Sequence, residues 1–165
     1  MAYVTEPTEE WVALHVADIM TSVTVTDSTS GTLRGAAEQM WRQQTGSLVI
    51  VDGDSITGII TERDVLQAIA AGARPDTAPI ADIMTRDLIT VGPDTSVRDA
   101  ARLMATHWIR HLPIVDDGKL VGIISQRDVT GVFAAMWQES GLPEIDVDNL
   151  VRERRLARIE AGDLD

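Results

Sequence analysis

The chain has 165 residues, with 14 Lys and Arg, 26 Asp and Glu and no Cys, and its formal net charge is −12. The lack of Cys excludes disulfide bonds and thiolate chemistry, and the acidic charge argues against nucleic-acid binding, which depends on Lys and Arg neutralising phosphates. No apolar run reaches the roughly 18–20 residues that cross a membrane, and the first residues lack the basic start of a signal peptide, so we expect no membrane association and a cytoplasmic protein.

Residues 1–15 form a lead-in segment with a predicted helix, because acidic residues occupy the first turn after Thr8. Residues 16–72 form a first structural unit. It is predicted to contain a short strand at 23–25, a helix at 32–44 and a hairpin of strands at 47–51 and 56–60. Thr61 then opens a helix that ends at Gly72.

Two prolines in residues 73–79 make a helix there unfavourable, so this segment is predicted to be a linker. Residues 80–137 form the second unit, with a predicted short strand at Leu88–Ile89 and a helix that Ser96 and Asp99 can cap together. Strands are predicted at 112–115 and 120–124, and Ser125 opens the last helix of the unit. Residues 138–165 are a charged tail with a predicted helix.

The two units are copies of one another. Residues 16–21 (VADIMT) recur at 80–85 (IADIMT), and residues 58–65 (GIITERDV) recur at 122–129 (GIISQRDV), so that Asp64 and Asp128 are 64 positions apart, as are Met20 and Met84. Each copy has the predicted order strand–helix–strand–strand–helix, which defines a mixed α/β (α+β) fold class. One copy is too small to bury a good core, so we expect the two to stack sheet against sheet.

The most distinctive polar residues occur in both copies as Thr61 with Asp64 and Ser125 with Asp128. One interpretation is a capping box, in which the hydroxyl accepts from a free backbone N–H group and the carboxylate reaches back. The other is a ligand site, because a helix N-terminus suits a phosphate and a carboxylate can accept hydrogen bonds from vicinal hydroxyls such as those of a ribose. The two interpretations are compatible, since one hydroxyl can serve both.

Residues 58–65 and 122–129 resemble the signature of CBS domains, which are named after cystathionine β-synthase, and the ADIMT segments and residues 111–116 (HLPIVD) are similar to that family as well. The resemblance covers residues 16–137. It implies a Bateman module, in which two βαββα repeats pack sheet to sheet with pseudo-two-fold symmetry and leave two equivalent clefts. In the family these clefts bind adenosine derivatives such as AMP, ADP, ATP, NAD or S-adenosylmethionine, and a homodimer is common.

Carried onto this chain, the resemblance implies one cleft, the Asp64 site, formed by Ile59, Thr61, Asp64, Thr85, Leu88, Thr90, Ile109, Arg110 and His111. It implies a second cleft, the Asp128 site, formed by Ile123, Ser125, Asp128, Thr21, Thr24, Thr26, Thr45, Gly46 and Ser47. Arg63 and Arg127 are either solvated residues at a helix start or phosphate contacts.

The two sites differ in charge. The Asp64 site has Arg110 and His111 where the Asp128 site has Gly46 and Ser47. Because cations suit phosphates better than small neutral residues do, we expect the Asp64 site to bind the more highly phosphorylated ligand, or to bind it more tightly.

The sequence contains no nucleophile–base pair and no phosphate-binding glycine loop. His107 and His111 are four apart, but they fall at a helix end and a strand start, so no metal site is expected. We therefore expect a regulatory protein and not an enzyme, one that requires no cofactor, senses an adenine nucleotide and signals to an effector protein by a shift in conformation. Two alternatives stay open: a protein-interaction module with empty, structural clefts, and an enzyme acting on a nucleotide.

Overall fold

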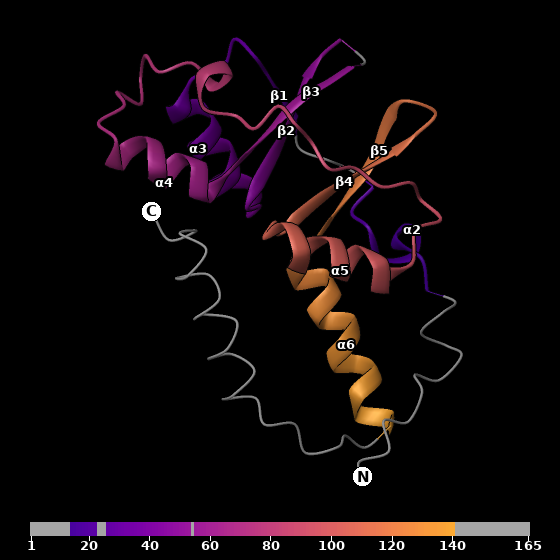
Figure 1. The fold of residues 1–165 in the computed structure, drawn as a ribbon. Coiled ribbons are helices and arrows are strands. Elements are labelled where there is room, and N and C mark those ends of the chain that lie inside the picture. Colours follow the sequence, from indigo (N-terminus) through magenta and orange to yellow (C-terminus); the bar gives the residue numbers. More distant parts are fainter. Residues whose placement is uncertain (1–13, 23–25, 54, 141–165) are drawn as a thin grey trace. The chain divides into compact units, whose positions relative to one another are not determined.

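The computed structural model describes residues 14–22, 26–53 and 55–140, and the chain divides into one compact unit up to Thr130 and another from Gly131 (Figure 1). The two copies lie in the first unit, except for residues 131–140 of the last described helix. The predicted lead-in helix, the predicted strand at 23–25 and most of the predicted tail fall outside the described residues.

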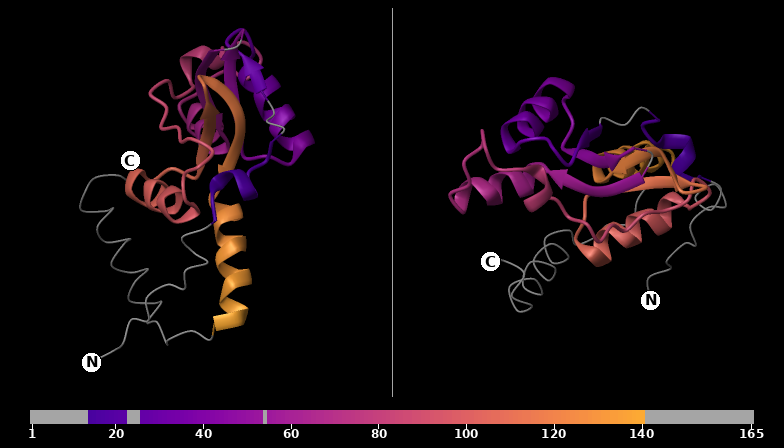
Figure 2. Two further views of the ribbon diagram at one scale, coloured as in Figure 1. Left: turned by 90° about the vertical axis from the view of Figure 1, so that its right-hand side faces the viewer. Right: turned by 90° about the horizontal axis from the view of Figure 1, so that it is seen from above.

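The first copy contains a three-stranded sheet with two longer helices beside it. Its elements are α2 (Val16–Ile19), β1 (Thr26–Ser28), α3 (Leu33–Gln43), β2 (Ser47–Asp52), β3 (Ser55–Thr61) and α4 (Glu62–Ala70). β2 pairs in parallel with β1 and antiparallel with β3, and α3 and α4 pack on each other and on this hairpin (Figures 1 and 2). The predicted helices and hairpin are confirmed, with α2 as an additional short helix.

The second copy repeats this arrangement with a smaller sheet. Its elements are the 3-10 helix η1 (Ile80–Asp82), α5 (Val97–His107), β4 (His111–Asp116), β5 (Lys119–Ser125) and α6 (Gln126–Ser140). β4 and β5 form an antiparallel hairpin with the same register irregularity as the first, after Ile114 here and after Ile50 there. The mixed helix and strand class with two small sheets is as the sequence predicted.

The predicted strand at Leu88–Ile89 is wrong. The backbone N–H of Leu88 bonds the carbonyl of Arg86, a local turn that prevents sheet pairing. Pairing is limited to one parallel bridge between Val91 and Ile114, and Pro93, which has no N–H to donate, follows two residues later. The second copy therefore has only a single bridge where the first has β1.

The core of the first copy lies between α3 and the sheet. Leu33, Ala36 and Met40, one stripe of α3, pack with Leu48 and Ile50. Because side chains alternate between the two faces of a strand, Val49 and Ile59 point to the opposite face. Both are also buried, as expected where β3 contacts β5 of the second copy. The sheet is therefore covered on both faces, and one cover is the other repeat.

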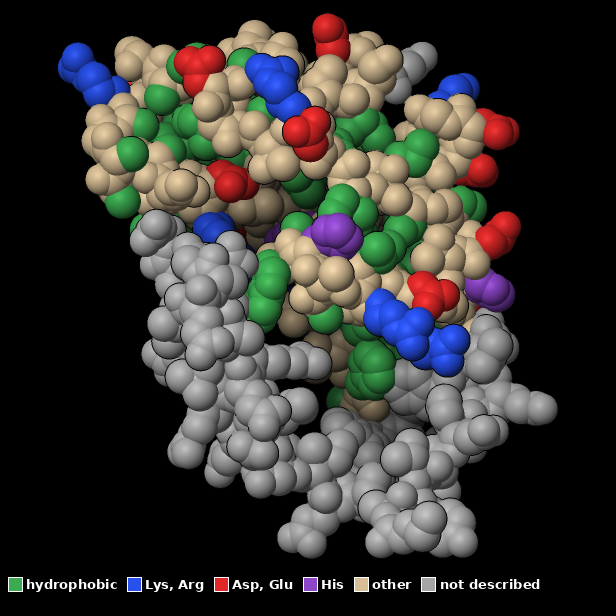
Figure 3. All heavy atoms as spheres, viewed as in Figure 1, with side chains coloured by type: hydrophobic (Ala, Val, Ile, Leu, Met, Phe, Trp, Pro, Cys, Tyr) green, Lys and Arg blue, Asp and Glu red, His purple; other side chains and the backbone are tan. Residues whose placement is uncertain are grey.

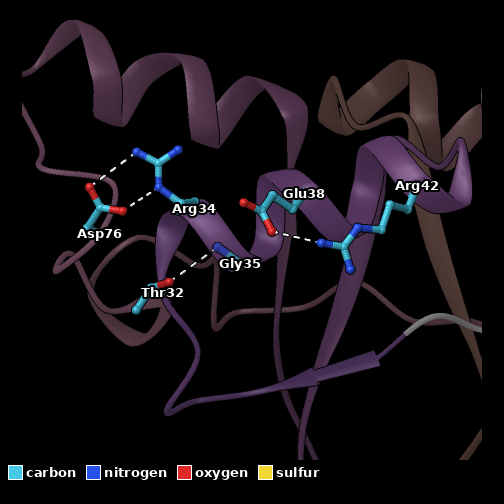
Figure 4. Close-up of polar contacts among 6 residues, drawn as sticks. All are labelled: Thr32, Arg34, Gly35, Glu38, Arg42 and Asp76. Carbon is cyan, nitrogen blue, oxygen red and sulfur yellow. Dashed lines mark hydrogen bonds and ion pairs between the residues drawn. The ribbon is translucent and has the colours of Figure 1, made fainter.

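The linker between the copies is fastened to the start of α3. The N–H groups of Leu33 and Arg34 donate to the carbonyls of Ala78 and Pro75, both at 2.9 Å. The Arg34 guanidinium pairs with Asp76, and the hydroxyl of Thr32 caps the helix by accepting from the N–H of Gly35 at 3.2 Å (Figure 4). The linker is thus part of the folded unit, although it contains no helix.

The two copies are joined by backbone hydrogen bonds. Ile59 and Thr85 exchange two N–H···O bonds of 2.9 Å each, and Thr21 and Ile123 exchange two of 3.0 and 3.2 Å. Each copy thereby pairs the segment before its first strand with the last strand of the other copy. The repeated MT and GII sequences are the residues that make this exchange.

Glycine is required next to each bridge. A Cβ atom added at Gly58 would lie 2.6 Å from Met84 Sδ and 2.9 Å from the carbonyl oxygen of Thr85. One added at Gly122 would lie 2.6 Å from Met20 Sδ and 3.0 Å from the carbonyl oxygen of Thr21. The lack of a side chain at these positions lets the two backbones approach closely.

Gly58→Ala should therefore lower the free energy of unfolding by about 1–3 kcal/mol, because the added methyl group overpacks a contact that includes backbone. Gly92→Ala is the matched control, since nothing lies within 4 Å of its Cβ position, and a change of no more than about 0.5 kcal/mol is expected. Urea unfolding measures both, and equal stability of the two variants would contradict the close approach.

Candidate functional site

Each repeated Thr/Ser–Asp pair caps the helix that follows the cross-repeat bridge. The backbone N–H and the hydroxyl of Thr61 both donate to Asp64 Oδ2 at 2.7 Å, and the N–H of Asp64 is 3.4 Å from Thr61 Oγ1. Ser125 donates in the same way to Asp128 Oδ2 at 2.7 and 2.6 Å, and the N–H of Asp128 is 3.3 Å from Ser125 Oγ. The capping interpretation of both pairs is confirmed.

The caps leave capacity for a ligand. In both pairs the donors converge on Oδ2, while Oδ1 of Asp64 and of Asp128 has no hydrogen bond from any described residue. All four capping residues are partly exposed. Since an ionised carboxylate offers about four lone-pair sites, each Asp can accept hydroxyl groups from a ligand without giving up its cap.

Each cap also lies beside the start of the neighbouring strand in its own copy. The N–H of Glu62 donates to the carbonyl of Gly46 at 3.1 Å, and the N–H of Gln126 donates to that of Arg110 at 2.8 Å. Ser47 is the cross-strand partner of Thr61. His111 is the cross-strand partner of Ser125.

The structure brings together some of the predicted members of each site. Thr85 lies beside Ile59 in the Asp64 site, and Thr21 lies beside Ile123 in the Asp128 site. In the described residues, no hydrogen bond joins residues 109–111 to the Asp64 cap or residues 45–47 to the Asp128 cap. The two segments meet where the ring of His111 lies against Gly46, since a Cβ atom there would be 3.3 Å from His111 Nε2.

The remaining predicted residues are more peripheral. Leu88 is half-buried and Thr90 exposed on the segment after Thr85, and Thr26 is exposed at the start of β1. Thr45 donates to the carbonyl of Ser47, and Ile109 is half-buried just before β4. Arg63, Arg110 and Arg127 are exposed. Thr24 lies outside the described residues.

Two features of the site were not evident from the sequence. The hydroxyl of Ser47 is buried and has no hydrogen-bond partner among the described residues, and the residue is only 3% exposed. Glu62 lies near the His111 ring, since both approach the Cβ position of Gly46 at 3.3–3.4 Å. The sequence shows that Glu62 belongs to the acidic first turn of a helix. It does not show that His111 of the other copy lies near it, because only the tertiary fold brings the two together.

The pKa of His111 is shifted by its surroundings. Burial is the main cause that lowers the pKa of His111 below its ordinary value, and the adjacent Arg110 lowers it further. The carboxylates of Glu62 and Asp128 act in the opposite direction without reversing the shift. The imidazole is therefore neutral at neutral pH although two carboxylates act on it electrostatically.

The face of the molecule seen in Figure 3 carries acidic and basic side chains scattered over it, with apolar side chains between them. In the described part of the chain, no three His, Asp or Glu side chains group as metal ligands. No helix there combines the length and apolar character needed to cross a bilayer.

The fold defines a class of protein in which a mixed α/β unit is duplicated and the two copies are joined by exchanged strand pairing. The family model of the CBS domain matches residues 16–71 and again residues 80–135. The chain belongs to the CBS-domain family.

Individual relatives agree with this assignment. The CBS domain-containing protein YhcV of Bacillus subtilis is 36% identical over 114 residues, which cover 69% of this chain and 81% of that protein. A protein with CBS domains from Burkholderia ambifaria has a TM-score of 0.71 at 30% identity, covering 80% of this chain and 99% of that one. The CBS domain pair of protein MJ0100, in complex with 5′-methylthioadenosine and S-adenosyl-L-methionine, has a TM-score of 0.70 at 30% identity, with coverage of 75% and 98%.

The shifted His111 predicts a pH dependence of stability. The unfolded chain protonates this histidine at about pH 6.5, whereas the folded chain resists protonation. Stability should therefore be lost as the pH falls through this value, and more protons bind to the unfolded state in that window. His111→Gln should flatten the loss between about pH 7 and pH 5, while His107→Gln, at an exposed position, should follow the parent curve. Parallel curves for the parent and His111→Gln, from chemical unfolding, would contradict the assignment.

The unpaired hydroxyl of Ser47 predicts that Ser47→Ala stabilises the ligand-free protein. Leaving a buried polar group without a partner costs about 1–3 kcal/mol, and alanine removes that cost. Ser96→Ala is the matched control: Ser96 caps α5 by accepting from Asp99 N–H at 3.0 Å, so its loss should destabilise by about 1 kcal/mol. Urea unfolding should move the two variants in opposite directions, and a shared loss of stability would show that the Ser47 hydroxyl is satisfied.

Proposed function

We propose that this protein is a regulatory module that binds an adenosine-derived ligand at the Asp64 and Asp128 sites and transmits occupancy to a partner by a change in conformation. The observation that supports it is the duplicated cap, in which each Asp accepts twice on Oδ2 and keeps Oδ1 for a ligand. The vicinal hydroxyls of a ribose match such an acceptor, and charge-assisted hydrogen bonds of this kind are about twice as strong as neutral ones.

The related MJ0100 pair supports the ligand class. The two molecules bound by that protein, 5′-methylthioadenosine and S-adenosyl-L-methionine, have an adenine and a ribose in common. In our proposal the carboxylate holds the ribose, the helix N-terminus and the cap hydroxyl serve a phosphate when one is present, and Thr85 or Thr21 borders the base. Arg63 and Arg127 would add charge at the mouth of each site. No cofactor is needed and no reaction takes place.

The route for the signal is the exchanged backbone pairing. A ligand held by groups from both copies favours the arrangement in which Ile59 meets Thr85 and Ile123 meets Thr21, and so shifts the population toward it. We further propose a homodimer, because Trp41 and Leu66 are 78% and 70% exposed on α3 and α4, and large exposed apolar side chains favour an interface. The effector protein would read the ligand-bound dimer.

A second candidate is a protein-interaction module whose clefts are purely structural, and the self-satisfied caps favour it. A thermal-shift screen with adenosine, AMP, ADP, ATP, NAD and S-adenosylmethionine separates the two candidates. A ligand at about 100 times its dissociation constant should add about 2.7 kcal/mol of stability. Stabilisation by at least one of the six supports the sensor, and none by any of them favours the interaction module.

The Asp64 site should be the one that prefers the more highly phosphorylated ligand. Asp64→Ala should weaken ADP binding more than Asp128→Ala does, and the loss of one charge-assisted hydrogen bond, about 1.5–3 kcal/mol, corresponds to roughly 10- to 150-fold in affinity. Calorimetry measures this, and an equal loss in both variants would contradict the difference between the sites.

Asp99→Ala is the matched control for these variants. Its carboxylate accepts from the Ser96 hydroxyl at 2.7 Å at the start of α5, so it has a similar capping role at a helix that belongs to neither site. It should cost about 1 kcal/mol of stability without a change in ADP affinity. A loss of affinity in Asp99→Ala would show that cap stability, not ligand contact, explains the effect.

A further inference from the structure

His111 lies where the groups of the two sites meet. It is the first residue of β4, in the second copy, yet its ring lies against Gly46 of the first copy. A Cβ atom at Gly46 would be 3.3 Å from His111 Nε2 and 3.4 Å from Glu62 Oε2. The ring and this carboxylate therefore approach one backbone position from opposite copies, in space that the lack of a side chain at Gly46 leaves free.

The charged groups around the ring come from each neighbouring element. Arg110 adjoins it on its own segment, and the carboxylates of Glu62, at the start of α4, and Asp128, at the start of α6, act on the ring electrostatically. Its cross-strand neighbour on β5, Ser125, is uncharged. Glu62 directly follows the cap residue of the Asp64 site, and Asp128 is the carboxylate of the Asp128 site. The ring thus lies within electrostatic reach of both sites.

The His111 imidazole is neutral in this arrangement, but a small change in its surroundings can favour the protonated form. Arg110 and burial disfavour the imidazolium, whereas two carboxylates favour it, so the balance is sensitive to one more negative charge. A phosphate placed near Arg110 would offset that cation and favour the imidazolium. An uncharged ligand such as adenosine brings no such charge.

We propose that His111 is a positioning residue that takes up a proton from solvent when a phosphate-bearing ligand binds, and that the imidazolium then holds Glu62 and Asp128 and so links the two sites. The inference rests on the proposed function and goes further, because it makes affinity for phosphorylated ligands depend on pH and makes one site sense the phosphate bound at the other. The proton moves from a buffer acid to a ring nitrogen, and no covalent bond to the ligand forms.

Calorimetric titration of the full chain tests this with ADP and with adenosine, each in two buffers of equal pH and unlike ionisation enthalpy. ADP binding should take up as much as about one proton at about pH 6, and its affinity should rise toward acid pH, tenfold for each unit by which the pKa rises. Adenosine binding should take up none. Because a phosphate group itself titrates near pH 6, the decisive quantity is the difference between the parent and His111→Gln.

Three variants test whether the proton uptake belongs to the His111 ring. His111→Gln should remove the part of the proton uptake that belongs to the ring, and His107→Gln, exposed on α5, should retain it. Gly46→Ala should reduce it with His111 intact, because the new methyl group displaces the ring from the other copy. Equal uptake in the parent and His111→Gln would overturn the inference while leaving the proposed function standing. Failure of ADP to bind at any pH would overturn the inference, and only failure of all six ligands of the thermal-shift screen would overturn the proposed function as well.

Discussion

The close approach of two backbones at Gly58 and at Gly122 is the constraint on which the rest of the molecule depends. At each place a strand of one copy hydrogen-bonds to the MT segment of the other, and no residue larger than glycine fits without displacing backbone. The last strand of each copy therefore takes one neighbour from the other copy. The capping hydroxyl follows three residues after each glycine and the carboxylate three residues after that, so the same contact that joins the copies also positions the candidate sites.

Local features of this fold could be predicted from the sequence, because their causes are local. The stripe of Leu33, Ala36 and Met40 predicted α3, and the Thr–Asp and Ser–Asp spacing predicted both caps. The single bridge at Val91 could not be predicted, since the residues before it are compatible with a short strand as well as with an irregular segment. The approach of His111 to Gly46 also could not be predicted, because it depends on how one copy meets the other.

The structure explains sequence differences between the copies that an alignment of the two only records. Gly46 occupies the position of Arg110, and Ser47 that of His111. In the structure these are not two independent versions of one site, because Gly46 is the surface against which His111 lies. The smaller residue of one copy makes room for the larger residue of the other. The symmetry of the two copies is therefore broken at the contact between Gly46 and His111, and a substitution at either residue alters the surroundings of the other.

The fastened linker has a consequence for how the chain assembles. Backbone bonds from Leu33 and Arg34, together with the Arg34–Asp76 pair, hold residues 75–78 against the start of α3. The segment that must reach the first copy's β3 therefore begins from a fixed point, at a high effective concentration relative to its target. The same pairing made between separate chains would produce interlocked dimers. A short, anchored connection favours pairing between the two copies of one chain. Loosening it would favour pairing between copies of different chains.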